Sequence, residues 1–216
     1  SKQFSEVTTA VVTVTGALLA LSVTFLANSV WNSEDKARET VYAEARSIRV
    51  METYMEAMTG PSRDGLARLI GDYAKAVKAE WPGMGEGGAS GAEQALGSIY
   101  SAVLRGFGEG DANRVLQQRL LTALDTLSVA RQQRLSMAQD VVSAGQWTLV
   151  SGLTVMLLLI VAISHAYYHV ARRISLCVLS VALSIVLYVI VLHHSPFLGP
   201  YAQTPELILA AAGVEP

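Results

Sequence analysis

Charge is scarce in this sequence, and long stretches have none. Lysine and arginine together number 16 and aspartate and glutamate 18, which gives a formal net charge of −2. This balance excludes the bulk positive field with which a protein attracts nucleic acid. Three windows contain no Asp, Glu, Lys or Arg, at 7–33, 141–171 and 174–205. Each window is longer than the about 20 apolar residues that a helix needs to cross a bilayer.

Cysteine is almost absent, and proline and glycine are missing from one long stretch. The single cysteine, Cys177, allows no disulfide within the chain and lies in the third uncharged window, where a thiol is inert. Neither proline nor glycine occurs from Ala17 to Thr59, so a helix that crosses the bilayer need not end at its surface. We therefore predict one long helix, half in lipid and half in water.

Between the first and second windows the pattern is that of a soluble helical domain. Apolar residues recur every three or four positions along 36–59, 62–80, 92–105 and from Asp111 onward, where the helix is open to merging with the second span. Pro82 is expected to keep Trp81 out of the helical conformation, and 83–91 to form a flexible loop. The first of these apolar stripes is Ala37, Val41, Ala45, Ile48, Met51, Met55 and Met58.

These features predict an all-α membrane protein with three visible spanning helices and a helical cytosolic domain inserted between the first and second. The expected segments are a first span at 1–31, the domain at 32–145, a transmembrane hairpin at 146–193 and a C-terminal Pro-Phe segment with a short helix at 194–216. The hairpin is expected to turn near 170–173. Cationic residues favour a cytoplasmic domain by the positive-inside rule. On the domain side they are Lys36, Arg38, Arg46, Arg131 and Arg134, against Lys2, Arg172 and Arg173.

An apolar ladder lies on one helical face of the first window. Ala17, Leu21 and Phe25 are each four residues apart, and Gly16 stands beside them. Around a symmetry axis such a ladder forms a hydrophobic constriction that gates by dewetting. A face that packs against other helices has the same spacing, and spacing alone favours packing. The window holds no ionisable group for a proton or ion relay.

Histidines provide the candidate metal ligands. His165 and His169 are four residues apart in the predicted second span, so both rings face the same way, as a metal or porphyrin pair requires. No nearby carboxylate or cysteine completes a site, and the intervening tyrosines favour an interfacial anchor. The adjacent His193 and His194 point to different faces, which also favours the interface.

Other charged residues admit ordinary explanations. Arg131 and Arg134, near the mouth of the second span, attract anions or lipid headgroups, or serve only as topogenic positive residues. Charges along 44–52 suit an ionic ladder on a solvated or inter-subunit face. No nucleophile, base and acid set stands out, and the glycine-rich loop lacks a phosphate-loop ending. We therefore predict neither an enzyme nor a cofactor.

Several short motifs together resemble the bestrophins, especially a bacterial bestrophin-like family. The second membrane helix of that family is similar to Gly16-x4-Leu21-x3-Phe25-x5-Trp31-x5-Ala37-Arg38. The Pro-Phe element after the last bestrophin span is similar to Ser195-Pro196-Phe197-Leu198-Gly199. The intervening domain is similar at Tyr73-Ala-Lys-Ala-Val77-x2-Glu80-Trp81-Pro82 and at Ala130-Arg131-Gln-Gln-Arg134-Leu135. In order and spacing these motifs cover nearly the whole chain.

The resemblance implies a homopentamer around a central pore, with a neck lined by the second family helix, here at Ala17, Leu21 and Phe25. It also implies four spans, the first of which is expected before Ser1. The expected location is the bacterial inner (plasma) membrane, as a multi-pass protein with its middle domain in the cytoplasm. His194 and Ser195 stand where animal bestrophins place calcium-binding acids, so calcium activation is not expected.

The function implied is that of a bestrophin-like ion channel subunit, through whose apolar neck small ions pass. Its expected partners are the lipid bilayer, further copies of the chain and small ions, without nucleic acid. The alternative is a non-conducting membrane scaffold or accessory subunit of a larger membrane complex. That alternative is motivated by the lack of intramembrane charge and by the exposed methionine-rich helix around Met51, Met55 and Met58. Subunit stoichiometry in detergent separates the two.

Overall fold

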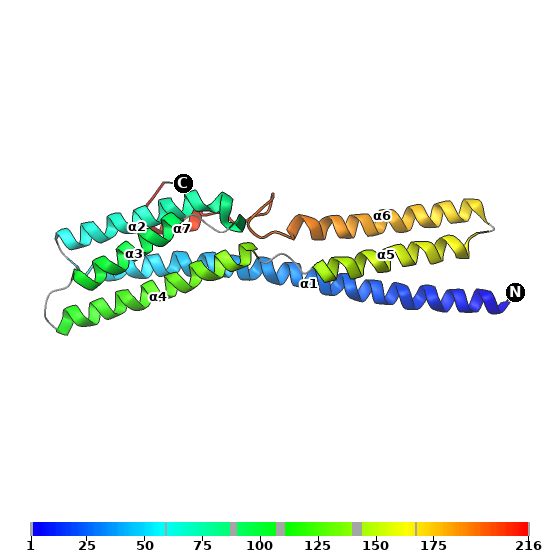
Figure 1. The fold of residues 1–216 in the computed structure, drawn as a ribbon, viewed down its shortest axis with the longest axis horizontal. Coiled ribbons are helices and arrows are strands. Elements are labelled where there is room, and N and C mark those ends of the chain that lie inside the picture. The colour runs from blue at the N-terminus through cyan, green and yellow to red at the C-terminus, as the bar shows by residue number, and fades with distance from the viewer. Residues whose placement is uncertain are drawn as a thin grey trace. The chain divides into compact units, whose positions relative to one another are not determined.

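The structure is a computed structural model that describes residues 2–58, 60–86, 90–106, 111–139, 144–166 and 168–215. All regular elements in these ranges are helical, which confirms the predicted all-α class. They run in the order α1 (Lys2–Met55), α2 (Pro61–Glu80), the 3-10 helix η1 (Trp81–Glu86), α3 (Ser90–Arg105), α4 (Asp111–Gln139), α5 (Ala144–Ser164), α6 (His169–His193) and α7 (Glu206–Ala211) (Figure 1).

Helix α1 is unbroken from Lys2 to Met55, as the absence of proline throughout it and of glycine after Gly16 predicts. The next helix starts after a turn in which Gly60 has a φ of 81°, a conformation that residues with a Cβ rarely adopt. Pro61 then opens α2, where its missing N–H removes no helical hydrogen bond. This turn ends the first predicted soluble helix close to its expected position.

The chain divides into two compact units, which we call the membrane unit and the domain unit. The membrane unit comprises Ser1–Glu34, Val141–Ser195 and Gly199–Tyr201, and the domain unit Asp35–Asp140, Pro196–Leu198 and Ala202–Pro216. Each has its own apolar core. In the membrane unit the core contains Leu19, Leu26 and Val30 of α1, Val150 and Leu157 of α5, and Ile190 of α6.

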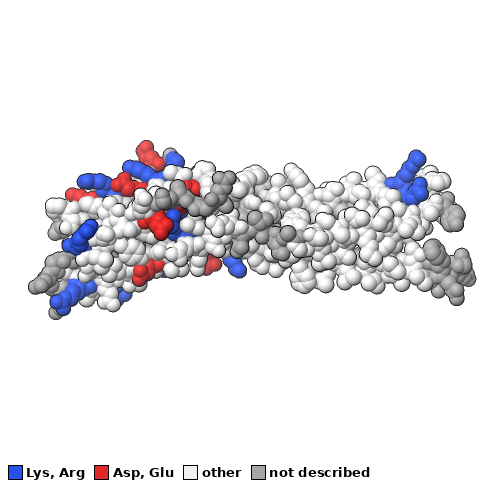
Figure 2. All heavy atoms as spheres, in the orientation of Figure 1, with Lys and Arg blue, Asp and Glu red and all other residues white. Residues whose placement is uncertain are grey.

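Three helices, α1, α5 and α6, are long and apolar enough to cross a bilayer. Figure 2 shows the surface of α5 and α6 without charge apart from a basic group at one end, where α6 carries Arg172 and Arg173. The hairpin turns earlier than predicted, after Ser164 rather than near 170–173. The 21 residues of α5 span about 31 Å at 1.5 Å per residue, so this helix already matches the bilayer core where it ends.

The domain unit is a helical bundle in which α2 packs along α3, α3 against α4, and α7 on α2 (Figure 1). Helix η1 packs on both α2 and α4. The predicted stripe of α1 is buried here, from Ala37 at 0% exposure to Met55 at 5%, with Met58 partly buried against it. The α2 stripe is buried too, including Leu66, Ile70, Tyr73 and Val77.

Two local predictions differ from the structure. Trp81 is helical despite preceding Pro82, with a φ of −54° and ψ of −46°, because its backbone N–H still bonds Val77 and its side chain is held by the tertiary contacts described below. The predicted loop 83–91 begins with the 3-10 helix and a buried Met84, while 87–89 lie outside the described residues. Helix α4 ends at Gln139 and α5 begins at Ala144, and the junction at 140–143, where the sequence left a merger open, lies outside the described residues.

Candidate functional site

The predicted ladder lies on the outward face of α1 in the membrane unit. Leu21 is 52% and Phe25 62% exposed, and Ala17 is exposed beside them. The opposite face carries Thr15, Leu19, Leu26 and Val30, and all four are buried. The three aliphatic residues among them belong to the core that α1 forms with α5 and α6. Packing inside this chain therefore uses the other face of α1, and the three ladder residues remain available to contacts outside it.

Phe25 also borders a cavity of about 360 Å³ between α1 and α5. Ser22 and Leu26 of α1 line it, together with Gln146, Leu149 and Val150 of α5. The aromatic ring thus lies at the edge of the α1–α5 contact, with open space on one side. An aromatic side chain in this position is exposed enough to project toward a neighbouring copy or toward a central axis.

Three hydroxyl groups of α1 in the membrane unit, those of Thr13, Ser22 and Thr24, are satisfied by the backbone of the same helix. Thr13 donates to the carbonyl of Thr9 at 2.9 Å, and Ser22 and Thr24 donate four residues back at 2.8 Å. Bonds of this kind let serine and threonine lie in a membrane helix without an unpaired donor. These hydroxyls therefore do not mark the outward face of α1 as water-exposed.

A buried ionic cluster lies at the centre of the domain unit, formed by Glu44, Tyr73, Glu80, Arg131 and Arg134. The Arg134 guanidinium donates from Nε to Glu44 at 2.8 Å and from Nη2 to Glu80 at 2.8 Å. Arg131 donates to the other oxygen of Glu80 at 2.9 Å, and the Tyr73 hydroxyl donates to Glu44 at 2.5 Å. Two carboxylates and two guanidinium groups balance in charge, as burial requires.

The cluster joins elements that are far apart in the sequence. It connects α1, α2 and α4, since Glu44, Glu80 and Arg134 come from these three helices. Removing one partner of a buried ion pair leaves an uncompensated charge, at a cost of about 3–5 kcal/mol. We therefore assign the cluster to holding the helices of the domain unit in register.

Trp81 extends the cluster to the C-terminal segment. The guanidinium of Arg134 lies 4.8 Å from the centre of the Trp81 ring, and its Nη1 also contacts the Met84 sulfur. The indole N–H donates to the carbonyl of Gln203 at 3.1 Å. Phe197 meets the same ring edge-on, with centroids 5.8 Å apart. These contacts explain why Trp81 adopts the helical conformation that Pro82 disfavours.

The environment of the cluster shifts two pKa values. Burial raises the pKa of the Tyr73 phenol well above 10, and the negative charge of Glu44, which accepts the hydrogen bond of the phenol, raises this pKa further. Burial alone lowers the pKa of Arg134, but the charge of Glu44 and the hydrogen bonds to Glu44 and Glu80 outweigh it and raise that pKa. Tyr73 is therefore a neutral donor and Arg134 a permanent cation at physiological pH.

Sequence analysis missed this cluster, although its signal is present in the stripes. Glu44 falls between Val41 and Ile48 in the buried stripe of α1, at steps of three and four. Glu80 continues the α2 stripe three residues after Val77. Charged residues at core positions of several helices predict one another as partners, since an unpaired charge is seldom buried.

The structure gives Arg131 and Arg134 different surroundings from those predicted. Both guanidinium groups are buried and paired with Glu80 or Glu44, so the arrangement lends no support to an attraction of anions or lipid headgroups. The predicted ionic ladder along 44–52 loses Glu44, which points into the core. Arg46 and Arg49 remain on the exposed side of α1.

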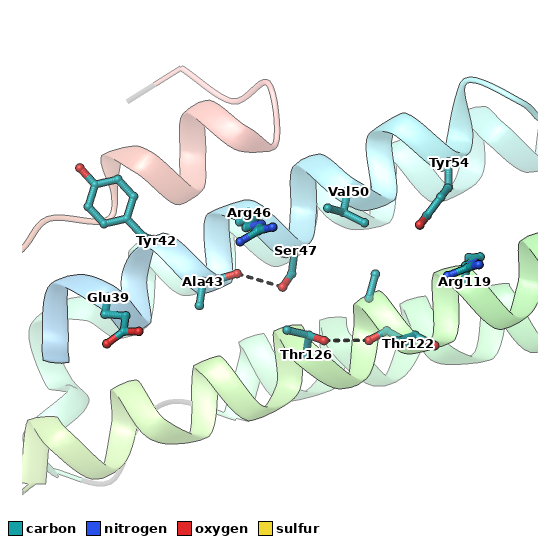
Figure 3. A pocket seen from close by; sticks show the side chains of 11 residues that line it. Glu39, Tyr42, Ala43, Arg46, Ser47, Val50, Tyr54, Arg119, Thr122 and Thr126 are labelled. Atoms are coloured by element: carbon teal, nitrogen blue, oxygen red, sulfur yellow. Dashed lines mark hydrogen bonds between the residues drawn. The ribbon is translucent and has the colours of Figure 1, made fainter.

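A groove of about 470 Å³ lies between α1 and α4 in the domain unit (Figure 3). Arg46 and Tyr54 line it from α1 and Arg119 from α4. Its hydroxyls bond locally, since Ser47 donates to Ala43 at 2.9 Å and Thr126 to Thr122 at 3.0 Å. The groove carries several polar side chains, but these bonds leave it no convergent set of catalytic groups.

The two histidine pairs do not form a metal site among the described residues. His165 follows the end of α5 and His169 begins α6, so the premise that they share one helix is wrong. The His165 ring bonds the Val161 carbonyl at 3.1 Å, as expected at a helix end. At the other end of α6, His193 stacks on Tyr201 with centroids 4.9 Å apart.

Comparison with known proteins gives a family and a fold. The family described as "Bestrophin-like domain" matches residues 1–207. No curated protein sequence matches the chain. A bacterial bestrophin homolog from Klebsiella pneumoniae is 14% identical with a TM-score of 0.70, and a membrane protein with a glycine-to-alanine substitution is 12% identical with a TM-score of 0.71. Each comparison covers 96% of this chain and 88% of the other.

Proposed function

Because this chain belongs to the bestrophin-like family, we propose that it is the subunit of an oligomeric ion channel. In this proposal small ions pass passively through an apolar neck lined by Ala17, Leu21 and Phe25 of α1. The neck residues of several copies face a common axis, and the apolar rungs hold the path dry until water and ions enter together.

The observation that carries the proposal is the outward ladder of α1. A bilayer-crossing helix buries one face against α5 and α6 and leaves Leu21 and Phe25 more than half exposed on the other. The outward faces of the hairpin helices also bear large apolar side chains, such as Val178 and Ile185 on α6. The hairpin therefore suits contact with lipid, and α1 suits contact with further copies of itself.

The same family membership supports the assembly and location that we propose. We assign a homopentamer in the bacterial inner membrane, with segment 32–145 as a cytoplasmic domain between the first span and the hairpin at 146–193. Basic residues at the start of α6, Arg172 and Arg173, lie at the end of that helix that follows the hairpin turn. Arg131 and Arg134 are buried in ion pairs, so they no longer count as exposed cations on the domain side. The proposed orientation in the membrane is therefore supported by the family and by Lys36, Arg38 and Arg46.

Ion flux into liposomes that hold the purified protein tests the proposal. We expect flux of Cl⁻ or Na⁺ in the wild type, and an increase on the order of tenfold in Phe25→Ala, because removing the ring lowers the dewetting barrier and each 1.4 kcal/mol is tenfold in rate. Val178→Ala, on the outward face of α6, is the matched control and should conduct like the wild type. An intact oligomer that passes neither ion contradicts the channel and favours a scaffold role.

A further inference from the structure

Two asparagines continue the outward ladder of α1 within the membrane unit. Asn28 and Asn32 follow Leu21 and Phe25 at steps of four, three and four residues, so all four lie on one helical face. Both asparagines are exposed. At 1.5 Å per residue, Asn28 lies about 4.5 Å and Asn32 about 10 Å further along the helix than Phe25.

The two amides differ from three hydroxyl groups of α1 in the same membrane unit. Thr13, Ser22 and Thr24 satisfy their hydroxyls on the α1 backbone. Asn28 and Asn32 have no hydrogen-bond partner among the residues that the structure describes. An amide without a partner is poorly placed against acyl chains, because an apolar medium offers it no hydrogen bond in place of those it makes with water. This face of α1 therefore suits water or a neighbouring copy rather than lipid.

The hairpin helices α5 and α6 differ from α1 in the chemistry of their exposed side chains. From Ile174 to Val191 the exposed large side chains of α6 are aliphatic or Tyr188, without an amide or a charge. Helix α5 has one described amide, Gln146, which is only half exposed at its first turn and lines the cavity beside Phe25. Among the residues of the membrane unit whose side chains the structure describes, exposed amides are thus confined to the face of α1 that carries the apolar ladder.

We propose that Asn28 and Asn32 contact permeating monovalent ions directly, as rings of amides at the domain end of the apolar neck. An amide offers a carbonyl oxygen to a cation and N–H donors to an anion, so it replaces a lost water for either sign. The rings ease the passage of partly dehydrated ions out of the apolar neck without selecting their charge. This inference rests on the proposed channel function.

Reversal potentials under a NaCl gradient test the contact. Asn28→Asp should shift permeability toward Na⁺ and Asn28→Lys toward Cl⁻, each by roughly fivefold, the factor expected for a unit charge about 4 Å from an ion in water. Asn28→Leu should lower the flux of both ions several-fold by lengthening the apolar stretch. Asn113→Asp makes the same charge change on α4 and should leave the reversal potential unchanged.

Thiol labelling supplies a readout that does not depend on conduction. In a Cys177→Ser background, Asn28→Cys in liposomes should react with a membrane-impermeant methanethiosulfonate added on both sides. Val178→Cys, equally exposed on the lipid-facing side of α6, should stay unlabelled.

The outcomes separate this inference from the proposed function. If the wild type conducts but the Asn28 variants keep its reversal potential, or if Asn28→Cys stays unlabelled in an intact oligomer, the ion contact is overturned while the channel stands. If the intact wild-type oligomer passes no ion, both are overturned.

Discussion

At the residue scale, Tyr73 illustrates how burial turns an ordinary side chain into a structural donor. Its hydroxyl bonds a carboxylate that Arg134 also holds, and the ring itself is fully buried in the domain core. A hydrogen bond to a charged group contributes about 1.5–3 kcal/mol. The phenol must keep its proton for the hydrogen bond to persist, so we expect the domain to lose stability at alkaline pH.

The sign of that dependence follows from the raised pKa. Above pH 10 the unfolded chain loses the Tyr73 proton while the folded chain keeps it, so the free energy of unfolding falls as pH rises from 10 toward the folded pKa. Tyr100, whose pKa burial and Asp125 raise to about 12, contributes a smaller slope of the same sign between pH 10 and 12. Thermal unfolding of the detergent-solubilised protein from pH 8 to 11 measures the sum.

Tyr73→Phe should flatten most of this slope and lower stability at pH 8 through the lost hydrogen bond to Glu44. Tyr42→Phe is the matched control, because Tyr42 lies on α1 with its side chain 55% exposed. It should keep the wild-type pH dependence. An unchanged slope in Tyr73→Phe would show that deprotonation of Tyr73 does not cause the loss of stability at alkaline pH.

At the element scale, η1 is a short helix held by contacts on two sides. Trp81 bonds the carbonyl of Gln203, stacks under Arg134 and meets Phe197 edge-on. The segment that carries Phe197 follows α6 but belongs to the domain unit. The helical Trp81 before Pro82 is therefore a tertiary outcome, in which several contacts outweigh a local preference.

Phe197→Ala tests how much the contact between Phe197 and Trp81 stabilises the domain unit. Phe197 is only 6% exposed, and truncating a buried phenylalanine to alanine costs about 3–5 kcal/mol. We expect the near-ultraviolet circular dichroism of the tryptophans to weaken and the domain to unfold at a lower temperature. Phe197→Leu restores most of the volume without the aromatic edge and should lose clearly less. Equal stability of both variants and the wild type would contradict the role of this contact.

At the scale of the whole molecule, the channel that we propose needs further copies of the chain, because the predicted neck residues lie on an outward face of α1. A path for ions then requires several copies around an axis. Native mass spectrometry in detergent should give five copies of this chain and no other protein. A single copy within a different complex would instead support the accessory-subunit role, and a monomer would leave the ladder without an axis.

The sequence by itself determined the elements and the core faces. The uncharged windows and the missing prolines and glycines account for three long apolar helices and an unbroken α1, because helix continuity depends on local backbone chemistry. The stripes from Ala37 to Met55 and from Leu66 to Val77 were readable since a helical period of 3.6 residues places them on one side. The motif order also identified the bestrophin-like family.

Only the tertiary structure decided which residues are partners. Glu44, Glu80 and Arg134 come from three helices, and the sequence contains no distance between them until those helices pack. The helical conformation of Trp81 likewise depends on a contact with a segment far away in the chain, since its indole N–H donates to the Gln203 carbonyl. Local conformational preferences act over a few residues, whereas the position of a buried charged side chain depends on the opposite charge that helix packing brings next to it.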